Sequence, residues 1–295
     1  MAADVISGNE VAKTIRAELK DEVSKMKASG VTPGLVVILV GEDPASQVYV
    51  RKKGEACEEL GIKSETIRLP AGTSEEEMLG LIDKYNADSE FDGILVQLPL
   101  PKQISEEKVL MRIDPGKDVD GFHPVNVGKM VVGAESYLPC TPAGIQELLV
   151  RSGNDPKGKH VVILGRSNIV GKPIANILVQ KAAGADATVT VCHSRTKDLP
   201  ALSRQADILI AAMGVPKFVK ADMIREGVVV IDVGVNRIDD PSTKSGKRLV
   251  GDVDFDAVKE TAKAITPVPG GVGPMTITML MMNTVKAAKL ANGLL

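Results

Sequence analysis

Short apolar runs alternate with helical stretches along this chain, and this alternation constrains the fold more than any other feature of the sequence. The run Gly34–Gly41, GLVVILVG, is β-branched and bounded by glycines, as expected of a strand covered on both faces. A helix is predicted from about Pro44 to Leu60, and a second buried run, DGILVQL, follows later. Such alternation predicts a parallel sheet between helices, with ligands bound outside the carboxyl ends of the strands.

Three further elements complete the first half of the chain. Apolar residues recur every three or four positions from Asn9 to Ala28, which predicts an amphipathic helix. A short strand is expected at KSETIRL. The acidic motif SEEE predicts a helix that starts at Thr73 or Ser74.

The second half of the chain repeats the alternation and is predicted to be Rossmann-like. In chain order we expect a strand at KHVVILG, a helix to about Ala183, a strand at ATVTVC, a short helix, a strand at ADILIAA, a helix near Asp222–Glu226, and strands at VVVIDVG and LVGDVDF. A last helix is predicted over Met275–Leu290, with Pro274 just ahead of it.

The passage between the two halves lies in GFHPVNVGKMVVGAESYLPCTPAG, which is rich in Gly and Pro and has weak periodicity. With 295 residues, the chain is long enough for two domains. We therefore expect an N-terminal domain over residues 1–140 and a Rossmann-like domain over residues 141–274. The C-terminal helix, residues 275–295, is expected to pack back on the first domain.

Composition excludes several classes of protein. The formal net charge is −2, and no basic run is interleaved with aromatic residues, so we expect a small-molecule partner rather than nucleic acid or an anionic membrane. The start, MAADVISGNEVAK, lacks the apolar core of a secretory signal, which predicts a cytosolic protein. The three cysteines and three histidines are scattered, so we expect free thiols and no metal site.

A glycine turn joins a predicted strand to a helix in VVILGRSNIVGKPIANIL, Val161–Leu178. Gly165 and Gly171 match the dinucleotide fingerprint only loosely, because Ser167 replaces its middle glycine and one residue is added. Glycine still permits the tight turn, and the following helix offers N–H groups and a positive dipole end to a pyrophosphate. The alternative is that the turn is only a connector.

The next predicted strand, TVTVC, ends in HSRT and lacks the acidic residue that usually holds the ribose 2′-hydroxyl of NAD. His193, Ser194 and Arg195, joined by Arg166 from the glycine turn, would supply donors and positive charge to a 2′-phosphate. This pattern favours NADP over NAD. For Arg195 by itself, a solvated basic loop after a strand is the alternative.

Polar residues follow the second buried run of the first half. Gln97 closes GILVQLPLP at the carboxyl end of the strand, and the prolines behind it would stiffen the chain. Asp114, Asp118 and Asp120 crowd the next loop, DPGKDVDGFHP. Clustered aspartates are most often turn formers, as expected for Asp114 and Asp118, but one of the three could bind a ligand.

Seven motifs occur in this order and at these intervals: YVRKK, GILVQLPLP, KDVDGFHP, CTPAG, GRSNIVGKP, CHSRT and TPVPGGVGPMT. With them the sequence resembles the bifunctional methylenetetrahydrofolate dehydrogenase/methenyltetrahydrofolate cyclohydrolases over essentially its whole length. The resemblance implies two α/β domains, a parallel-sheet catalytic domain and a Rossmann-like NADP-binding domain, with a cleft between them. It also implies oxidation of 5,10-methylenetetrahydrofolate with NADP+, hydrolysis of the methenyl product to 10-formyltetrahydrofolate, and a homodimer formed through the nucleotide domain.

The resemblance assigns roles to individual residues. The catalytic and folate-binding set comprises Tyr49, which matches the tyrosine that packs on the aminobenzoate, Lys53, the catalytic lysine, Gln97, the amide paired with that lysine, and Asp120, the carboxylate that binds the pterin. The loop Gly270–Gly273 would line the cleft, with Pro269, Gly270 and Gly271 as substrate contacts. The cofactor set comprises Gly165, Arg166, Ser167, Gly171, His193, Ser194, Arg195 and Val235.

Tyr49 and Lys53 stand four residues apart on the predicted helix, so their side chains share one face. For an arbitrary pair at this spacing, a surface lysine stem lying over a tyrosine ring is the usual explanation. An ordinary lysine, with a pKa of about 10.4, is protonated at neutral pH, so burial and a cationic substrate would have to favour the neutral form for Lys53 to transfer protons. Gln97 could hold that amine without adding negative charge.

Three rival functions are weighed against this hypothesis. A dehydrogenase-only, NAD-linked relative is disfavoured by the HSRT segment. A different NADP-dependent dehydrogenase of similar build, such as one acting on a cyclic hydroxy acid, would not need the set Tyr49, Lys53, Gln97 and Asp120. A folate or nucleotide carrier without catalysis is disfavoured because all the proposed chemical residues are present.

Overall fold

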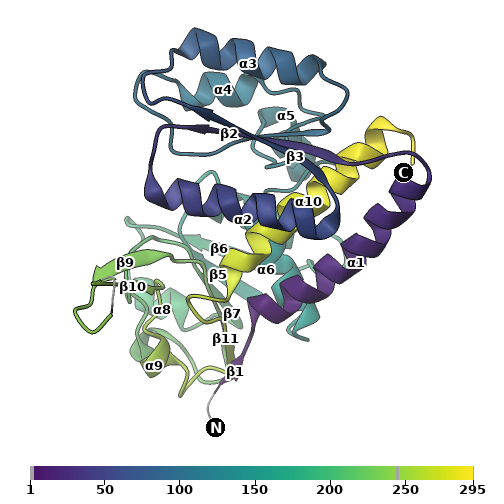
Figure 1. The fold of residues 1–295 in the computed structure, drawn as a ribbon. Helices are drawn as coiled ribbons and strands as arrows, with labels where there is room; N and C mark the ends of the chain where they lie inside the picture. Colours follow the sequence, from purple (N-terminus) through teal and green to yellow (C-terminus); the bar gives the residue numbers. More distant parts are fainter. Residues whose placement is uncertain (1–2, 244–245, 295) are drawn as a thin grey trace. The chain divides into compact units, whose positions relative to one another are not determined.

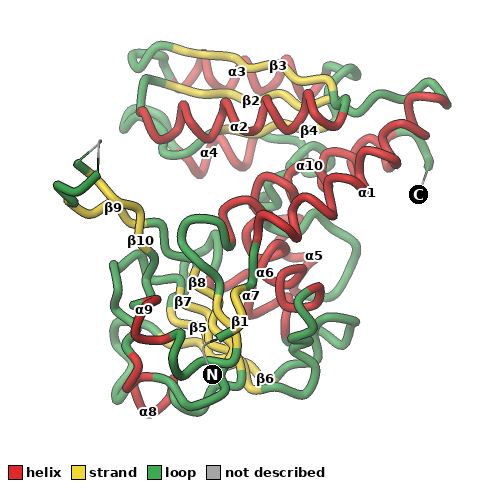
Figure 2. The backbone as a smooth tube through the Cα atoms, turned by 60° about the horizontal axis from the view of Figure 1, so that its bottom comes forward, coloured by secondary structure: helices red, strands yellow, loops and turns green. Residues whose placement is uncertain are grey.

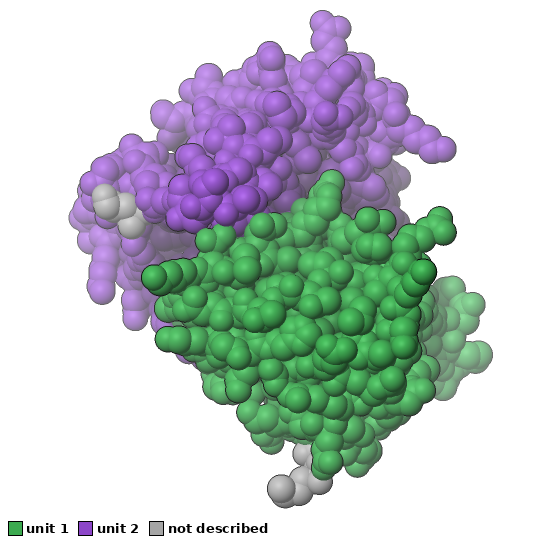
Figure 3. All heavy atoms as spheres, turned by 180° about the vertical axis from the view of Figure 1, so that it is seen from behind, with its two compact units in different colours: residues 1–13, 141–276 green, residues 14–140, 277–295 purple. Residues whose placement is uncertain are grey.

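The computed structural model describes residues 3–243 and 246–294, and the chain divides into two compact units (Figure 3). Unit 1 contains the described residues up to Lys13 together with residues 141–276, and unit 2 contains residues 14–140 and 277–295. The domain expected over residues 1–140 corresponds to unit 2, except that its first thirteen residues belong to unit 1. They group with unit 1 because β1 (Asp4–Val5) pairs with β11 (Ala264–Ile265).

Unit 2 is built on a three-stranded parallel sheet with the order β3-β2-β4. Its strands are β2 (Gly34–Val40), β3 (Lys63–Leu69) and β4 (Gly93–Val96). Ile38 of the central strand pairs with Ile67 of β3 and with Val96 of β4. Every residue of β2 and β4 is buried, as the uninterrupted apolar runs predict.

Helices cover both faces of this sheet (Figure 1). On one face α3 (Glu75–Ala87) and α4 (Glu106–Arg112) pack on the strands, and Val36, Ile82 and Val109 belong to one buried cluster there. α2 (Pro44–Leu60) lies on the other face. α5 (Pro124–Val131) follows α4, and α1 (Gly8–Ala28) and α10 (Val272–Ala291) each have most of their residues in unit 2.

Local signals fix where these helices begin. Asp43 caps α2 by accepting a hydrogen bond from the backbone N–H of Ser46 at 2.7 Å. Ser74 and Glu77 form a reciprocal capping box at the start of α3, so SEEE marks this helix as the sequence predicts. Both caps satisfy N–H groups that have no partner within the helix.

Unit 1 is built on a six-stranded parallel sheet with the order β1-β11-β8-β7-β5-β6. The remaining strands of this sheet are β5 (His160–Leu164), β6 (Thr188–Cys192), β7 (Ile208–Ala211) and β8 (Val229–Asp232). The helical elements are α6 (Cys140–Arg151), α7 (Gly171–Leu178), α8 (Leu199–Ser203), α9 (Phe255–Val258) and the 3₁₀ turn η1 (Ala221–Met223). β5 has β6 on one side and β7 on the other, so the carboxyl end of β5 is the switch point where parallel sheets bind ligands.

The predicted fold class, two α/β domains with parallel sheets, is confirmed. Several elements differ from the prediction. Two helices are not predicted by the sequence: α5 lies in the Gly- and Pro-rich middle segment, and α6 begins in that segment and continues beyond it. α7 ends at Leu178 rather than near Ala183, because the chain turns back and the N–H of Ala187 donates to the Leu178 carbonyl.

Three more elements of the second half differ as well. The helix expected near Asp222–Glu226 is only the turn η1. β10 (Lys247–Val250) does not join the parallel sheet; it pairs with β9 (Asn236–Asp239) in an antiparallel ribbon (Figure 2). α10 begins at Val272, so Pro274 lies inside its first turn, where proline is tolerated.

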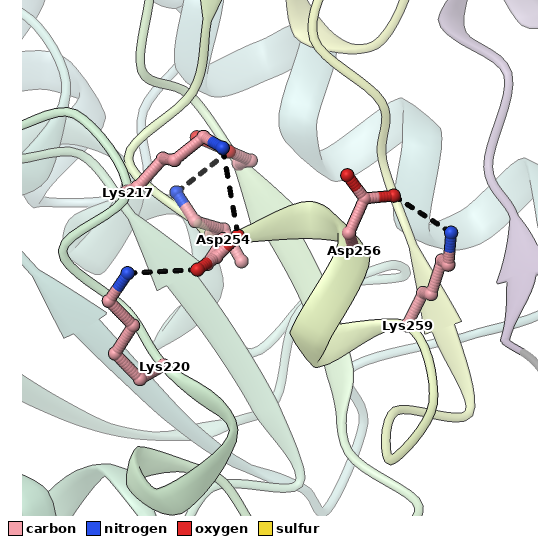
Figure 4. A network of polar contacts seen from close by, with 7 residues as sticks. Lys217, Lys220, Asp254, Asp256 and Lys259 are labelled. Atoms are coloured by element: carbon pink, nitrogen blue, oxygen red, sulfur yellow. Dashed lines mark hydrogen bonds and ion pairs between the residues drawn. The ribbon is translucent and has the colours of Figure 1, made fainter.

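Several ion pairs lie on the surface beside α9 (Figure 4). Lys220 Nζ donates to Asp254 Oδ2 at 2.8 Å, and Lys259 Nζ donates to Asp256 Oδ1 at 2.8 Å. These side chains are accessible to solvent, so such pairs contribute little to stability.

Among the described helices, none is both long and apolar enough to cross a membrane.

Candidate active site

Lys53 and Gln97 meet at the carboxyl edge of the unit 2 sheet. Lys53 lies in the third turn of α2, and only 8% of it is exposed. Gln97 follows β4 directly, and its own N–H donates to the carbonyl of Ile38 in β2 at 2.8 Å. Lys53 Nζ donates to Gln97 Oε1 at 2.9 Å, while Gln97 Nε2 donates to the Leu98 carbonyl at 2.8 Å. The amide is thereby oriented with its oxygen toward the amine.

Burial lowers the pKa of Lys53, and the nearby Asp120 carboxylate and Cys140 thiol oppose this change. For Asp120 the balance is reversed, because burial raises its pKa whereas Lys53 and a hydrogen bond from Cys140 lower it. Burial, reinforced by Asp120, holds the pKa of Cys140 well above its ordinary value. The site therefore contains an amine whose neutral form is favoured by burial and a carboxylate that partly restrains it.

The three aspartates of the following loop have different environments. Asp118 is buried and accepts hydrogen bonds from the N–H of His123 at 2.8 Å and from Asn126 Nδ2 at 2.9 Å. Asp114 accepts from the N–H of Gly116 at 2.6 Å in an exposed turn. Both have the geometry of turn formers. Asp120 instead interacts electrostatically with Lys53 and Cys140.

Tyr49 lies on α2, one turn before Lys53, and 38% of it is exposed. Because residues four apart on a helix project from one face, its ring and the lysine amine lie on the same side of α2. Of the four predicted catalytic residues, the structure thus brings Lys53, Gln97 and Asp120 together and places Tyr49 on the same helical face, open to a ligand.

The glycine turn of unit 1 leaves β5 and enters α7. A Cβ at Gly165 would lie 2.1 Å from the Ala212 carbonyl oxygen, and one at Gly171 would lie 2.2 Å from the Gly165 carbonyl oxygen. Gly165 also has a φ of +129°, which other residues rarely adopt. Ser167 Oγ accepts from the N–H of Gly171, the first residue of α7, at 3.3 Å. Only glycine at both positions allows this close turn.

The HSRT turn leaves β6 beside the glycine turn, because Leu164 of β5 pairs with Cys192 of β6 and the Gly165 N–H donates to the Cys192 carbonyl. The N–H of Arg195 donates to His193 Nδ1 at 3.1 Å. The side chains of Ser194, Arg195 and, in the glycine turn, Arg166 are exposed. The structure therefore brings the predicted cofactor residues from both turns to the carboxyl ends of two neighbouring strands.

The remaining predicted residues lie on two other loops of unit 1. Val235 follows β8 and is 52% exposed. Pro269 is exposed, and Gly270 has a φ of +102°. The Gly270 carbonyl accepts from the N–H of Asn9 at 3.2 Å, so the start of α1 holds this loop.

A buried pair of aspartates ties the loops around Val235 together, and sequence reasoning missed it. Asp232 Oδ1 accepts from the N–H of Gly234 and of Asp252, each at 2.9 Å. Asp252 Oδ2 in turn accepts from the N–H of Met213 at 2.6 Å, after β7. A Cβ at Gly234 would lie 2.3 Å from Asp252 Oδ1. The sequence signal is weak, because VVVIDVG and LVGDVDF read simply as strands.

Two residues beside Asp120 are likewise not singled out by the sequence. Cys140 lies in the motif CTPAG and is predicted only to be a free thiol, whereas its Sγ donates to the Val119 carbonyl at 3.5 Å and the thiol influences the pKa of Asp120. Asn283 lies on α10 and is buried. The helical pattern of α10 carries no signal for it.

These features suit a nucleotide. Three features meet at the switch point of the sheet: a close turn with no room for a Cβ at Gly165 or Gly171, the start of α7, and the exposed donors of the HSRT turn. Together they fit the phosphates of a dinucleotide. Within residues 3–243 and 246–294, no group of three or more His, Cys, Asp or Glu side chains could hold a metal ion. Fold and site together define a two-domain α/β enzyme that binds NAD(P).

Comparison with known proteins gives the particular family. The profile of the tetrahydrofolate dehydrogenase/cyclohydrolase catalytic domain matches residues 6–120, and that of the NAD(P)-binding domain of the same family matches residues 139–292. The chain belongs to the tetrahydrofolate dehydrogenase/cyclohydrolase family. The predicted family is thus confirmed.

Individual relatives extend this likeness over the full length. The chain is 63% identical to the bifunctional protein FolD of Syntrophobacter fumaroxidans, with 99% of each chain covered. The crystal structure of the bifunctional FolD of Campylobacter jejuni is 49% identical, with a TM-score of 0.92 over 98% of this chain and 99% of that one. The Trypanosoma brucei enzyme, solved with NADP and an inhibitor, is 41% identical, with a TM-score of 0.93 and 99% of each chain covered.

Proposed function

We propose that this chain oxidises 5,10-methylenetetrahydrofolate to 5,10-methenyltetrahydrofolate with NADP+ and hydrolyses the methenyl form to 10-formyltetrahydrofolate. The observation that carries this proposal is the hydrogen bond between buried Lys53 and half-buried Gln97, with Asp120 close enough to act on the lysine, in a member of a dehydrogenase/cyclohydrolase family. Burial lowers the pKa of Lys53, which favours the neutral amine that proton transfer needs.

The cyclohydrolase step requires proton movement. Water adds to the methenyl carbon, which loses its positive charge, and the attacking water must give up a proton. The neutral amine of Lys53 accepts this proton and returns it to the ring nitrogen as the C–N bond opens. The remaining hydroxyl proton leaves to solvent as the C=O bond of the formyl group forms. Gln97 holds the amine through its oxygen without adding the negative charge that would raise the lysine pKa.

The dehydrogenase step requires mainly orientation. NADP+, when bound, accepts the hydride of the one-carbon bridge. The residues of this chain bind and align the reactants: Tyr49 offers a ring for the aminobenzoate and Asp120 a carboxylate for the pterin. Gly165, Ser167 and Gly171 form the phosphate turn, and Val235 and the loop Pro269–Gly271 provide further contacts.

The HSRT turn supports a preference for NADP over NAD. It contains no carboxylate, while Ser194 and Arg195 are exposed beside the glycine turn with Arg166. A hydroxyl and guanidinium groups are the donors that a 2′-phosphate needs. The proposed folate substrate is consistent with the family. We also propose that the protein forms a homodimer and is located in the cytoplasm.

One assay tests the proposed function. The purified protein is mixed with 5,10-methylenetetrahydrofolate and NADP+, and NADPH, methenyl and formyl products are followed by absorbance and chromatography. Formation of all three supports the proposal. NADPH and methenyl product without enzyme-catalysed formyl product would reduce the function to a dehydrogenase, and tight folate binding without turnover would indicate a carrier.

A further inference from the structure

The side chain of Asn283, on α10, is hydrogen-bonded to two backbone segments next to Asp120 and Cys140. Its side-chain Nδ2 donates to the Val119 carbonyl at 2.8 Å and to the Leu138 carbonyl at 2.9 Å. Nδ2 also lies 3.7 Å from the Cys140 Sγ. The residue is 8% exposed, and all these atoms belong to unit 2. One amide group therefore uses both of its hydrogens to join two segments that are distant in sequence.

The two joined segments carry Asp120 and its neighbour Cys140. Val119 precedes Asp120, and Leu138 lies two residues before Cys140. The segments are also in close backbone contact, because a Cβ at Gly121 would lie 2.7 Å from the Leu138 carbonyl carbon. The Cys140 Sγ donates to the Val119 carbonyl at 3.5 Å across this junction, and Cys140 also interacts with the Asp120 carboxylate. The place of the Asp120 carboxylate therefore depends on how the two segments are fastened.

The same helix also contacts the element that carries the lysine. Met281 Sδ lies 3.5 Å from the Sγ of Cys57, one helical turn beyond Lys53 on α2. α10 thus provides a common support, on which one residue meets the helix of Lys53 and another meets the loop of Asp120.

We propose that Asn283 is a positioning residue, whose amide fixes the Val119 and Leu138 carbonyls so that the Asp120 carboxylate keeps its place beside Lys53 for folate binding. This inference rests on the proposed folate-binding role of Asp120. Without the amide, the buried Val119 carbonyl keeps only the weaker Cys140 thiol as a donor, the half-buried Leu138 carbonyl loses the Asn283 donor, and the junction is free to move. A displacement of about 1 Å at a substrate-positioning group is costly for binding and turnover.

The test compares two substitutions at one position. Asn283→Leu keeps the approximate volume and removes both donors, and Asn283→Gln keeps the donors but displaces them by one methylene. Calorimetric titration with tetrahydrofolate and with NADP+ gives both dissociation constants for each variant, including variants that do not turn over. We expect Asn283→Leu to weaken tetrahydrofolate binding roughly tenfold and Asn283→Gln to weaken it less, with NADP+ binding changed less than about twofold.

A matched control lies next to Asn283. Thr284 is also fully buried on α10, but its Oγ1 donates within the helix to the Leu280 carbonyl at 2.8 Å. Thr284→Val therefore removes a buried hydrogen bond from the same helix without touching the Asp120 junction. Its tetrahydrofolate affinity should stay close to that of the unsubstituted protein, even where its melting temperature falls.

A double-mutant cycle with Asp120→Asn separates positioning from general stabilisation. If Asn283 acts through Asp120, Asn283→Leu weakens tetrahydrofolate binding far less in the Asp120→Asn background. The inference would be overturned if Asn283→Leu weakened tetrahydrofolate binding equally with and without Asp120→Asn. It would also be overturned if Asn283→Leu alone did not weaken tetrahydrofolate binding. If Asn283→Leu does not fold, Asn283→Gln takes its place in the cycle. Unchanged folate affinity of Asp120→Asn itself would refute the proposed role of Asp120, which is a distinguishable failure.

Discussion

The Nζ of Lys53 and the Oε1 of Gln97 are 2.9 Å apart, although the two residues come from a helix and from the end of a strand that are 44 positions apart in sequence. The contact is possible because β4 pairs with β2 in parallel, so that β4 ends at the same edge of the sheet from which the chain enters α2. The acceptor is neutral. A buried lysine held by a neutral acceptor can lose its proton more readily than one held by a carboxylate.

This relationship predicts the effect of Gln97→Glu. A carboxylate beside Lys53 would raise the lysine pKa, so the pH profile of the cyclohydrolase reaction should move to higher pH. The neutral fraction, and hence the rate at pH 7, falls roughly tenfold when the lysine pKa rises by about one. The rate should rise with pH, because the active form of the base is the deprotonated one. Initial rates of methenyltetrahydrofolate hydrolysis across the pH range, corrected for the uncatalysed reaction, give the profile.

Gln97→Met is the matched control for that substitution. It removes the hydrogen bond to Lys53 without adding charge. The profile of the Met variant should therefore not move to higher pH, even if its rate falls. Identical alkaline displacements of both profiles would show that charge beside Lys53 is not what sets the pH dependence.

Removing the donors of the HSRT turn should change cofactor preference. In Ser194→Ala combined with Arg195→Leu, the KM for NADP+ should rise by roughly one to two orders of magnitude, because charge-assisted hydrogen bonds to a phosphate are lost. The KM for NAD+ should change little. Dehydrogenase kinetics with each cofactor test this, and Lys197→Ala, which removes an exposed charge from the same loop, controls for net charge. Equal weakening of both cofactors would refute the 2′-phosphate interpretation.

Asp118 should be important for stability rather than chemistry. Asp118→Ala leaves buried donors of Phe122, His123 and Asn126 without this acceptor, which should lower the free energy of unfolding by about 2 to 3 kcal/mol. Asp114→Ala, in an exposed turn, should cost less than about 1 kcal/mol. Urea unfolding of both variants makes the comparison. Equal losses would show that burial of Asp118 is not decisive.

The sequence predicts the central strands β2, β4, β5, β7 and β8, because buried parallel strands are continuous apolar runs and do not depend on distant residues for their signal. It misses β1 and β11, which are only two residues long. The limits of α2 and the start of α3 follow from Asp43, Pro44, Ser74 and Glu77, which act locally. α5 and α6 are hidden for the opposite reason. Their sequences contain Pro and Gly, and their burial is decided by tertiary packing that no local pattern records.

For the site, the residue types are visible in the sequence, and the resemblance supplies most of the roles. Neither the residue types nor the resemblance shows which contacts form between segments that are distant in sequence. Three features are consequences of long-range packing: Lys53 is buried, the Cys140 thiol donates to the Val119 carbonyl, and Asn283 bridges two carbonyls. Asn283 in particular occupies a helical position that is indistinguishable, in the sequence, from an ordinary polar residue.

The most direct test of the central claim, that Lys53 transfers the protons of the cyclohydrolase reaction, is the rate of 5,10-methenyltetrahydrofolate hydrolysis by Lys53→Met. Folding is verified by circular dichroism, and NADP+ titration verifies that unit 1 is intact. We predict a folded protein that binds NADP+ normally and hydrolyses the methenyl substrate no faster than buffer. Hydrolysis at the rate of the unsubstituted protein would contradict the assignment of Lys53.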